Sequence, residues 1–146
     1  MNRKLVVFFI AFAIILAVDQ IIKLIFLNGF NWESSWMSLT LAFNKGVAFS
    51  MFAFLGEYLK FIQTALILGV FYYLVKQKRI LNDHTAPLGI LLGAGSSNLL
   101  DRFIHGGVVD YVYWHHWFEF AIFNFADVAI DVAVFLIFLQ SFKGKR

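Results

Sequence analysis

The chain has 146 residues, of which 61% are hydrophobic, 19% aromatic and only 14% charged, and its net charge is +3. Soluble domains carry about 25% charged residues, so a soluble protein of this composition would lack the polar side chains to cover its surface. The composition therefore excludes a cytosolic globular enzyme, a disordered chain and a nucleic-acid-binding protein. The sequence contains no cysteine, which excludes disulfides, thiolate metal sites and cysteine nucleophiles.

Four stretches, taken in chain order, approach the roughly 20 apolar residues that a helix needs to cross a membrane. They cover residues 5–27, 58–75, 87–104 and 121–142. The first follows Arg3 and Lys4, as in a cleaved secretory signal, but no small-x-small cleavage site comes after it, so we expect it to be retained. The sequence predicts an all-α membrane protein with four transmembrane helices in one domain, residues 1–146.

Basic residues indicate which way these spans face. Eight of the twelve Lys and Arg residues lie before the first span, between the second and third, and after the fourth. The three clusters are Arg3-Lys4, Lys76-Lys78-Arg79 and Lys143-Lys145-Arg146. Since positive charge is enriched in cytoplasmic loops, both termini and the loop of residues 76–86 are expected in the cytoplasm. Segments 28–57 and 105–120 then lie on the outer side.

The outer segment of residues 28–57 is too long for a simple connection. Met37, Leu39, Leu41 and Phe43 alternate with a period of two, which predicts a short strand at the membrane surface. In the other outer segment, residues 111–118 are rich in aromatic side chains and are typical of a belt at the membrane interface.

Three carboxylates are predicted to lie at one depth. Asp19 and Asp101 are each 14 residues from the expected cytoplasmic end of their span, and Asp127 is 14 residues from Ser141, next to the end of the fourth span. At 1.5 Å per helical residue this is roughly 21 Å, within the outer third of the bilayer. Ionisable groups in a membrane are costly, so each is a candidate for function. We therefore expect a site near the outer surface.

Spacings of three or four residues place further polar residues on the same helix faces. The pairs are Asp19–Lys23, Asn98–Arg102, Asn124–Asp127 and Asp127–Asp131. For any single pair, the favoured explanation is a contact that holds two helices together. The stripe of Gly89, Gly93 and Ser97 indicates close helix packing.

Asp110 follows the third span and comes shortly after Gly106 and Gly107, which permit a sharp turn. A turn toward the fourth span would place Asp110 beside Asp127. Two adjacent carboxylates share a proton, and such a pair activates water and polarises a peptide carbonyl, as in aspartic proteases. The alternative is a turn-forming aspartate exposed to water.

Other chemistries have weaker support. The sequence has no HExxH zinc motif and no glycine-rich phosphate loop followed by lysine. His115, His116 and Glu119 could bind a metal, although an interfacial role explains them more simply, and Ser96 and Ser97 lack the Gly-x-Ser-x-Gly motif of hydrolases. We expect neither metal nor cofactor. A proton-coupled carrier, which needs acids near the middle of the bilayer, and a non-enzymatic helical scaffold remain the alternative classes.

Taken in order, the polar residues form five blocks that resemble the lipoprotein signal peptidases (signal peptidase II) of bacteria. The blocks are Asp19-Gln20-Ile21-Ile22-Lys23, Asn44-Lys45-Gly46-Val47-Ala48-Phe49, Asn98-Leu99-Leu100-Asp101-Arg102, Gly107-Val108-Val109-Asp110-Tyr111 and Phe123-Asn124-Phe125-Ala126-Asp127. Each block alone is weak, but the set of five extends from the first span to the last and is highly specific.

The resemblance implies an aspartic endopeptidase of the bacterial cytoplasmic membrane that needs no cofactor. Such an enzyme removes the signal peptide of prolipoproteins just before a diacylglyceryl-modified cysteine, works among membrane lipids and is inhibited by the cyclic peptide globomycin. The resemblance also implies a small extracytoplasmic β-cradle after the first helix. Its catalytic pair falls on Asp110 and Asp127. Its supporting residues fall on Asp19, Lys23, Asn44, Gly46, Asn98, Arg102 and Asn124.

Two places differ from the family pattern. The run Gly93-Ala94-Gly95-Ser96-Ser97 replaces the glycine-rich run expected before Asn98, and Asp131 is an additional carboxylate one turn from Asp127. The first affects the packing of the third span. The second either raises the proton affinity of the region around Asp127 or pairs with another span.

Overall fold

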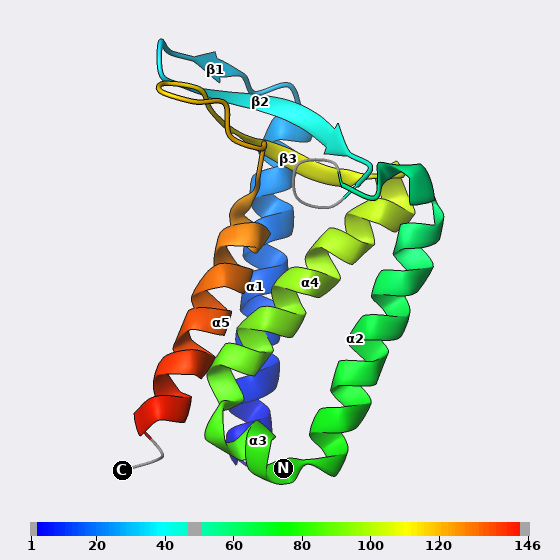
Figure 1. Cartoon of the computed structure of the whole chain (residues 1–146), viewed down its shortest axis with the longest axis vertical. Coiled ribbons are helices and arrows are strands. Elements are labelled where there is room, and N and C mark those ends of the chain that lie inside the picture. The colour runs from blue at the N-terminus through cyan, green and yellow to red at the C-terminus, as the bar shows by residue number, and fades with distance from the viewer. Residues whose placement is uncertain (1–2, 47–50, 144–146) are drawn as a thin grey trace.

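The computed structural model describes residues 3–46 and 51–143. In the described chain, four helices have 19 or more residues. They run side by side, and a small sheet lies across one end of them, opposite the end where the described chain begins and finishes (Figure 1). The elements in chain order are α1 (Arg3–Leu27), β1 (Trp32–Glu33), β2 (Met37–Asn44), the 3₁₀ helix η2 (Ala53–Leu55), α2 (Tyr58–Lys76), α3 (Lys78–Asp83), α4 (Thr85–His105), β3 (Val108–Trp114) and α5 (Phe125–Lys143).

Among the described residues, three helices are long and apolar enough to cross a membrane: α1, α2 and residues Phe125–Phe142 of α5. The mostly helical membrane protein is thus confirmed, but the count of four transmembrane helices is not. α4 has 21 residues, a sufficient length, yet its sequence is interrupted by polar side chains such as Asn98, Asp101 and Arg102. These side chains are buried inside the protein instead of facing outward.

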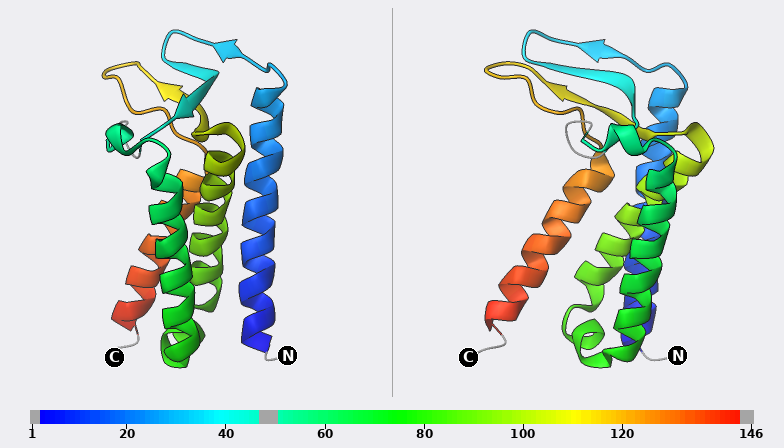
Figure 2. Two further views of the ribbon diagram at one scale, coloured as in Figure 1. Left: turned by 90° about the vertical axis from the view of Figure 1, so that its right-hand side faces the viewer. Right: turned by 45° about the vertical axis from the view of Figure 1, so that its right-hand side comes forward.

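α4 packs against α1, α2 and α5, so it is the central helix of the bundle (Figures 1 and 2). Gly89 and Gly93 let α1 approach closely, because a Cβ atom added at either position would lie 2.5 Å from the carbonyl oxygen of Phe8 or Phe12. The small-residue stripe predicted from the sequence is therefore the packing surface between α4 and α1. Many large apolar side chains of α1, such as Ile10 and Ile14, point outward, as expected of a lipid-facing helix.

The sheet is antiparallel with the order β1-β2-β3. β2 confirms the strand predicted from the alternation at residues 37–43. β1 and β2 follow α1, as expected, but the third strand comes from residues after α4, where the sequence indicated only an aromatic belt. In the register of β2 with β3, Ala42 is opposite Asp110 and Asn44 is opposite Val108.

The turn from α4 into β3 depends on two glycines. Gly106 ends α4 with a φ of 72°, a left-handed conformation that side chains disfavour. A Cβ atom on Gly107 would lie 3.0 Å from the carbonyl oxygen of Asn44, so this glycine allows β2 to pass closely. The predicted sharp turn is confirmed, and it places Asp110 on a strand that lies over the ends of the helices.

α5 begins at Phe125, four residues after the start of the predicted span at residue 121. The preceding residues are extended, because Phe123 and Val112 of β3 exchange backbone hydrogen bonds of 2.9 and 3.1 Å. The Phe125 N–H then donates to Tyr111 Oη at 2.9 Å. The first turn of α5 is thus held directly against β3.

Candidate active site

A cavity of about 670 Å³ lies beneath the sheet, among α2, α4 and α5. Apolar side chains of α2 and α5 line much of it, including Leu59, Ile62, Leu66, Val128 and Ile130. The polar residues of its lining are Asn44 of β2, Gln63 of α2, Asn98 and Arg102 of α4, Asp110 of β3, and Asp127 and Asp131 of α5. The two carboxylates expected to work as a pair therefore line one cavity, although they come from different elements.

Asp110 is buried on β3, with 2% of its surface exposed. Its Oδ1 atom accepts a hydrogen bond of 2.8 Å from Asn124 Nδ2. Burial, followed by the negative charge of Asp127, raises the pKa of Asp110 to about 7, against the hydrogen bonds from Asn44 and Asn124, which lower it. The Asp110 carboxyl therefore retains a proton at a pH where an exposed aspartate has lost it.

Asp127 lies in the first turn of α5, where its carboxylate caps the helix. The Asn124 N–H donates to Asp127 Oδ2 at 3.0 Å, and the Asp127 N–H donates to Asn124 Oδ1 at 3.0 Å. This reciprocal pair is a capping box, which satisfies backbone N–H groups at a helix start. The other carboxylate oxygen, Oδ1, accepts from Asn98 Nδ2 at 3.0 Å. Both oxygens of Asp127 are thus fixed by hydrogen bonds.

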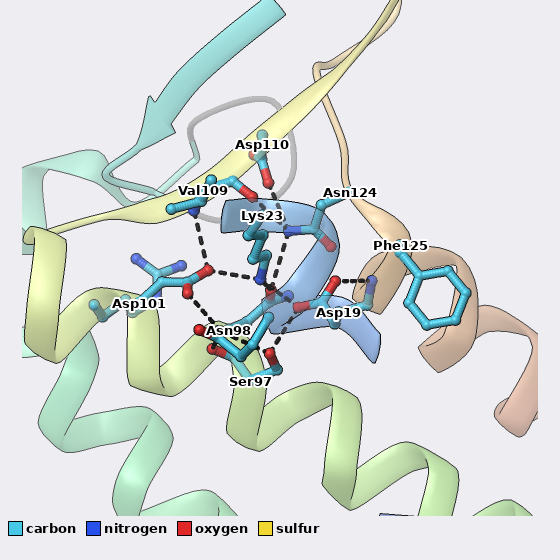
Figure 3. A network of polar contacts seen from close by, with 12 residues as sticks. Asp19, Lys23, Ser97, Asn98, Asp101, Val109, Asp110, Asn124 and Phe125 are labelled. Atoms are coloured by element: carbon cyan, nitrogen blue, oxygen red, sulfur yellow. Dashed lines mark hydrogen bonds and ion pairs between the residues drawn. The ribbon is translucent and has the colours of Figure 1, made fainter. Parts of the chain in front are cut away.

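Asn124 and Asn98 connect the two carboxylates to the rest of the protein. Besides Asp110, the Nδ2 group of Asn124 contacts Asn98 Oδ1 at 3.0 Å and the Val109 carbonyl at 3.2 Å. The same Asn98 oxygen accepts from Lys23 Nζ at 2.8 Å. Hydrogen bonds therefore connect Asp110 and Asp127 with the lysine of α1. Figure 3 shows the route from Asp110 through Asn124 and Asn98 to Lys23.

Behind the cavity, Lys23 forms two ion pairs. Its Nζ atom lies 2.6 Å from Asp19 Oδ2 and 2.6 Å from Asp101 Oδ2 (Figure 3). Ser97 Oγ donates to Asp19 Oδ2 at 2.7 Å, and Gln20 Nε2 donates to Asp101 Oδ1 at 2.8 Å. The predicted pairing of Asp19 with Lys23 is thus present, and Asp101 of α4 joins it from the same depth. In the described ranges, no buried side-chain nitrogen or oxygen lacks a hydrogen-bond partner.

Arg102 fastens the end of β2 to the helices. Its guanidinium donates to the Gly46 carbonyl, and its Nε atom donates to Gln63 Oε1 at 3.0 Å. The Gly46 N–H in turn donates to Asn44 Oδ1 at 2.9 Å, which closes a local turn. The remaining residues of this sequence block, Val47, Ala48 and Phe49, lie outside the described part of the chain.

Asp101 and Gln63 belong to this arrangement but were not among the catalytic and supporting residues that the family resemblance implied. Asp101 had a signal, since its depth equals that of Asp19 and Asp127. Gln63 had none beyond being a polar residue in an apolar span. Asp131 lines the cavity and is exposed, and in residues 3–46 and 51–143 no hydrogen bond or ion pair reaches its carboxylate.

The residues weighed as a metal site are arranged differently. His115 Nε2 lies 2.9 Å from the Oγ atom of Ser38, a residue of β2. His116 packs against the rings of Trp114 and Trp117. In the described residues, no group of three or more His, Asp or Glu side chains is placed to hold a metal ion.

Comparison with known proteins agrees with this geometry. A family model described as "Signal peptidase (SPase) II" matches residues 11–143. The chain belongs to the signal peptidase II family. The resemblance seen in the five blocks is therefore confirmed, and the chain is a protease.

Relatives named lipoprotein signal peptidase occur in Wolinella succinogenes, Helicobacter pylori (strain P12) and Campylobacter jejuni (strain ATCC 700819 / NCTC 11168). The Wolinella protein is 61% identical over 135 residues, 92% of this chain and 92% of its own length. The Helicobacter protein is 53% identical over 99% of this chain and 92% of its own. The Campylobacter protein is 53% identical over 93% and 87%.

A solved structure of a bacterial membrane enzyme has the same fold. Its TM-score is 0.76 at 21% sequence identity, over 93% of this chain and 87% of that chain. A second structure of a bacterial membrane enzyme gives a TM-score of 0.72, also at 21% identity, over 89% and 88%.

Proposed function

We propose that this chain is the membrane aspartic endopeptidase that removes the signal peptide from prolipoproteins, just before the diacylglyceryl-modified cysteine. Relatives named lipoprotein signal peptidase, 51–61% identical over most of the chain, support this substrate class. The observation that carries the proposal is that the Asp110 and Asp127 carboxylates line one cavity while Asn124 bonds to both residues. A binding protein would have no need of two carboxylates held in this way.

In the proposed mechanism, Asp110 and Asp127 are the catalytic pair and share one proton. The ionised carboxylate takes a proton from a water molecule, whose oxygen attacks the scissile carbonyl carbon. The protonated carboxyl donates its proton to the carbonyl oxygen, and a tetrahedral diol forms. On collapse, the C–N bond breaks, the leaving nitrogen takes up the proton held by the pair, and one diol hydroxyl returns a proton to the pair as the new carboxyl group forms. Because the two groups titrate as a unit, the shared proton is assigned to the pair.

The supporting residues have separate tasks in this proposal. Asn98 and Asn124 orient the two carboxylates by their hydrogen bonds. Arg102 holds the turn at Gly46 close to the cavity, where it limits the access of bulk water. Asn44 lines the cavity beside Asp110, while Asp19 and Lys23 anchor the network from α1.

We further propose that α4 spans the membrane as a fourth helix, within a single domain of residues 1–146. α1, α2 and α5 surround its polar side chains, so lipid does not meet them. The start of α1, which contains Arg3 and Lys4, lies at the end of the bundle opposite the sheet (Figure 1). The junction of α2 and α3, which contains Lys76, Lys78 and Arg79, lies at the same end. The positive-inside rule then supports cytoplasmic termini, a sheet on the outer side, and residence in the bacterial cytoplasmic membrane.

The cavity also suggests how substrate and inhibitor bind. Its apolar wall, formed by Leu59, Ile62 and Leu66 of α2 with Val128 and Ile130 of α5, suits the apolar part of a signal peptide. The acyl chains of the modified cysteine would remain among membrane lipids. A cyclic peptide such as globomycin would occupy the same cavity and block both carboxylates.

The test is cleavage of a lipidated prolipoprotein by the purified protein in detergent, with and without a chelator. The proposal expects cleavage before the lipidated cysteine, no effect of the chelator, and no cleavage of the same precursor without lipid. Failure to cleave, or proton-coupled transport by the reconstituted protein, would favour a carrier.

A further inference from the structure

Three buried charged residues stand behind the cavity and do not face it. Asp19 and Lys23 are each 0% exposed and Asp101 is 1% exposed, and none of the three is among the cavity-lining residues of the described chain. Taking charges out of water is expensive, and well-packed apolar residues hold helices together equally well. Helix packing alone therefore does not account for this group.

Asp101 reaches the strand that carries Asp110. Its Oδ2 atom, which pairs with Lys23, also accepts a hydrogen bond of 3.1 Å from the Val109 N–H. Val109 is 0% exposed and directly precedes Asp110 in β3. If Asp101 did not accept this bond, the buried N–H would lose its partner at the position next to a catalytic carboxylate.

Asp19 makes the equivalent contact with the helix that carries Asp127. Its Oδ1 atom accepts a hydrogen bond of 2.9 Å from the Ala126 N–H, and Ala126 directly precedes Asp127. N–H groups in the first turn of a helix have no partner inside that helix, so they bond to a group from elsewhere. Here that group is a carboxylate of α1.

We propose that Asp19, Lys23 and Asp101 form a clamp that fixes the relative positions of the two catalytic aspartates. Each acid of the clamp receives the backbone N–H immediately before one catalytic residue, and the Lys23 ammonium joins the two acids (Figure 3). β3 and α5 are separate elements, and both are thereby linked to the Lys23 ammonium, β3 through Asp101 and α5 through Asp19. The three are positioning residues, because they act through the backbone and do not touch the substrate cavity.

This inference rests on the proposed function and assigns Asp101 a role in that reaction. A plain tie between α1 and α4 would be satisfied by side-chain contacts alone, such as Gln20 with Ser97 at 2.9 Å. The two backbone contacts are what a positioning role requires. They are also what an experiment can remove one at a time.

The experiment replaces Val109 with its α-hydroxy acid, which changes one amide to an ester and deletes the N–H while every side chain stays. The matched control is the same replacement at Val112, whose N–H bonds to the Phe123 carbonyl at 2.9 Å and not to the clamp. A hydrogen bond to a charged group is worth roughly a tenfold to hundredfold change. We expect kcat to fall by about that factor for the Val109 ester with KM within about twofold, and by less than about threefold for the control.

The same ester in two Asp101 variants distinguishes a positioning role from general destabilisation of the protein. In Asp101→Leu the acceptor is gone, so the Val109 ester is expected to cause no further loss of kcat. In Asp101→Asn, which keeps an acceptor oxygen and serves if the leucine variant does not fold, the ester is expected to lower kcat again. An equal loss in all backgrounds, a raised KM, or an unchanged kcat for the Val109 ester would overturn the clamp. If the unmodified protein fails to cleave lipidated prolipoprotein, it is the proposed function that fails.

Discussion

Asn124 and Asp127 bond to each other twice, backbone N–H to side-chain oxygen in both directions, at 3.0 Å each. The proposed catalytic carboxylate of α5 is therefore also the residue that caps its own helix. This dual role explains why Asp127 stands in the first turn: there the unpaired N–H groups and the helix dipole stabilise negative charge. The position of a reacting group is in this way set by the start of a helix.

Replacing Asn124 separates capping from bridging. Asn124→Ala removes both, and we expect a loss of roughly 1 kcal/mol of stability together with a fall in kcat of at least about tenfold. Asn124→Ser keeps an acceptor for the Asp127 N–H but loses the donor to Asp110, so it should keep most of the stability and still lose activity. Thermal unfolding in detergent and single-turnover cleavage measure the two effects. Full activity of the serine variant would contradict the bridging role.

The pKa of Asp110, raised to about 7 by burial and by Asp127, predicts the alkaline limb of the reaction. A raised acid pKa means that the carboxyl keeps its proton up to that pH and loses it above. Once both carboxylates are ionised, no group donates to the scissile carbonyl oxygen. We expect kcat/KM to fall by about tenfold per pH unit above pH 7. A profile that stays level to about pH 9 would show that Asp110 does not titrate in this range.

Two glycines of α4 provide a matched pair for packing. A Cβ atom at position 93 would lie 2.5 Å from the Phe12 carbonyl oxygen, whereas at position 95 the nearest atom is Ile67 Cδ1 at 3.8 Å. We expect Gly93→Ala to push α1 from α4 and to cost about 1–3 kcal/mol, and Gly95→Ala to be tolerated. Thermal unfolding of both variants in the same detergent tests this. Equal stabilities would mean that α1 and α4 are not in close contact at Gly93.

Asp131 is exposed and lines the cavity one turn below Asp127. It does not contribute to the bonds that hold the catalytic pair, so we expect Asp131→Asn to change kcat/KM by less than about tenfold. A complete loss of cleavage, with the protein still folded, would show that Asp131 and not Asp127 is the reacting acid of α5. The same kinetic assay with lipidated prolipoprotein gives the answer.

Local patterns in the sequence predicted those parts of the site that depend on one helix at a time. The i,i+4 spacing of Asp19 and Lys23 gave a true ion pair, and a count of residues along each span placed Asp19 and Asp101 at one depth. That count gives depth but not rotation about the helix axis. Asp101 was therefore not recognised as the second acid on Lys23.

The parts that were wrong or missed depend on pairing between distant segments. Residues 121–123 continue the apolar run of α5, but they are extended, because Phe123 pairs with Val112 of β3. The region of β3 was interpreted as an aromatic belt. Its pairing with β2 joins residues far apart in the chain, and a local sequence pattern does not reveal such a pairing. The prediction of α4 as a fourth span is neither confirmed nor wrong and stays a proposal: its polar side chains make it less apolar than α1, α2 and α5, and its neighbours bury them.

The most direct measurement of the central claim is single-turnover cleavage of lipidated prolipoprotein by Asp110→Asn and Asp127→Asn, with Asp131→Asn as the control. Asparagine keeps the shape of the aspartate side chain, but its amide group cannot act as the acid or base that the reaction requires. We expect cleavage by either variant to fall by about a hundredfold to ten-thousandfold while the protein stays folded and inserted in the membrane. Near-normal cleavage by either folded variant would contradict the assignment of Asp110 and Asp127 as the catalytic pair.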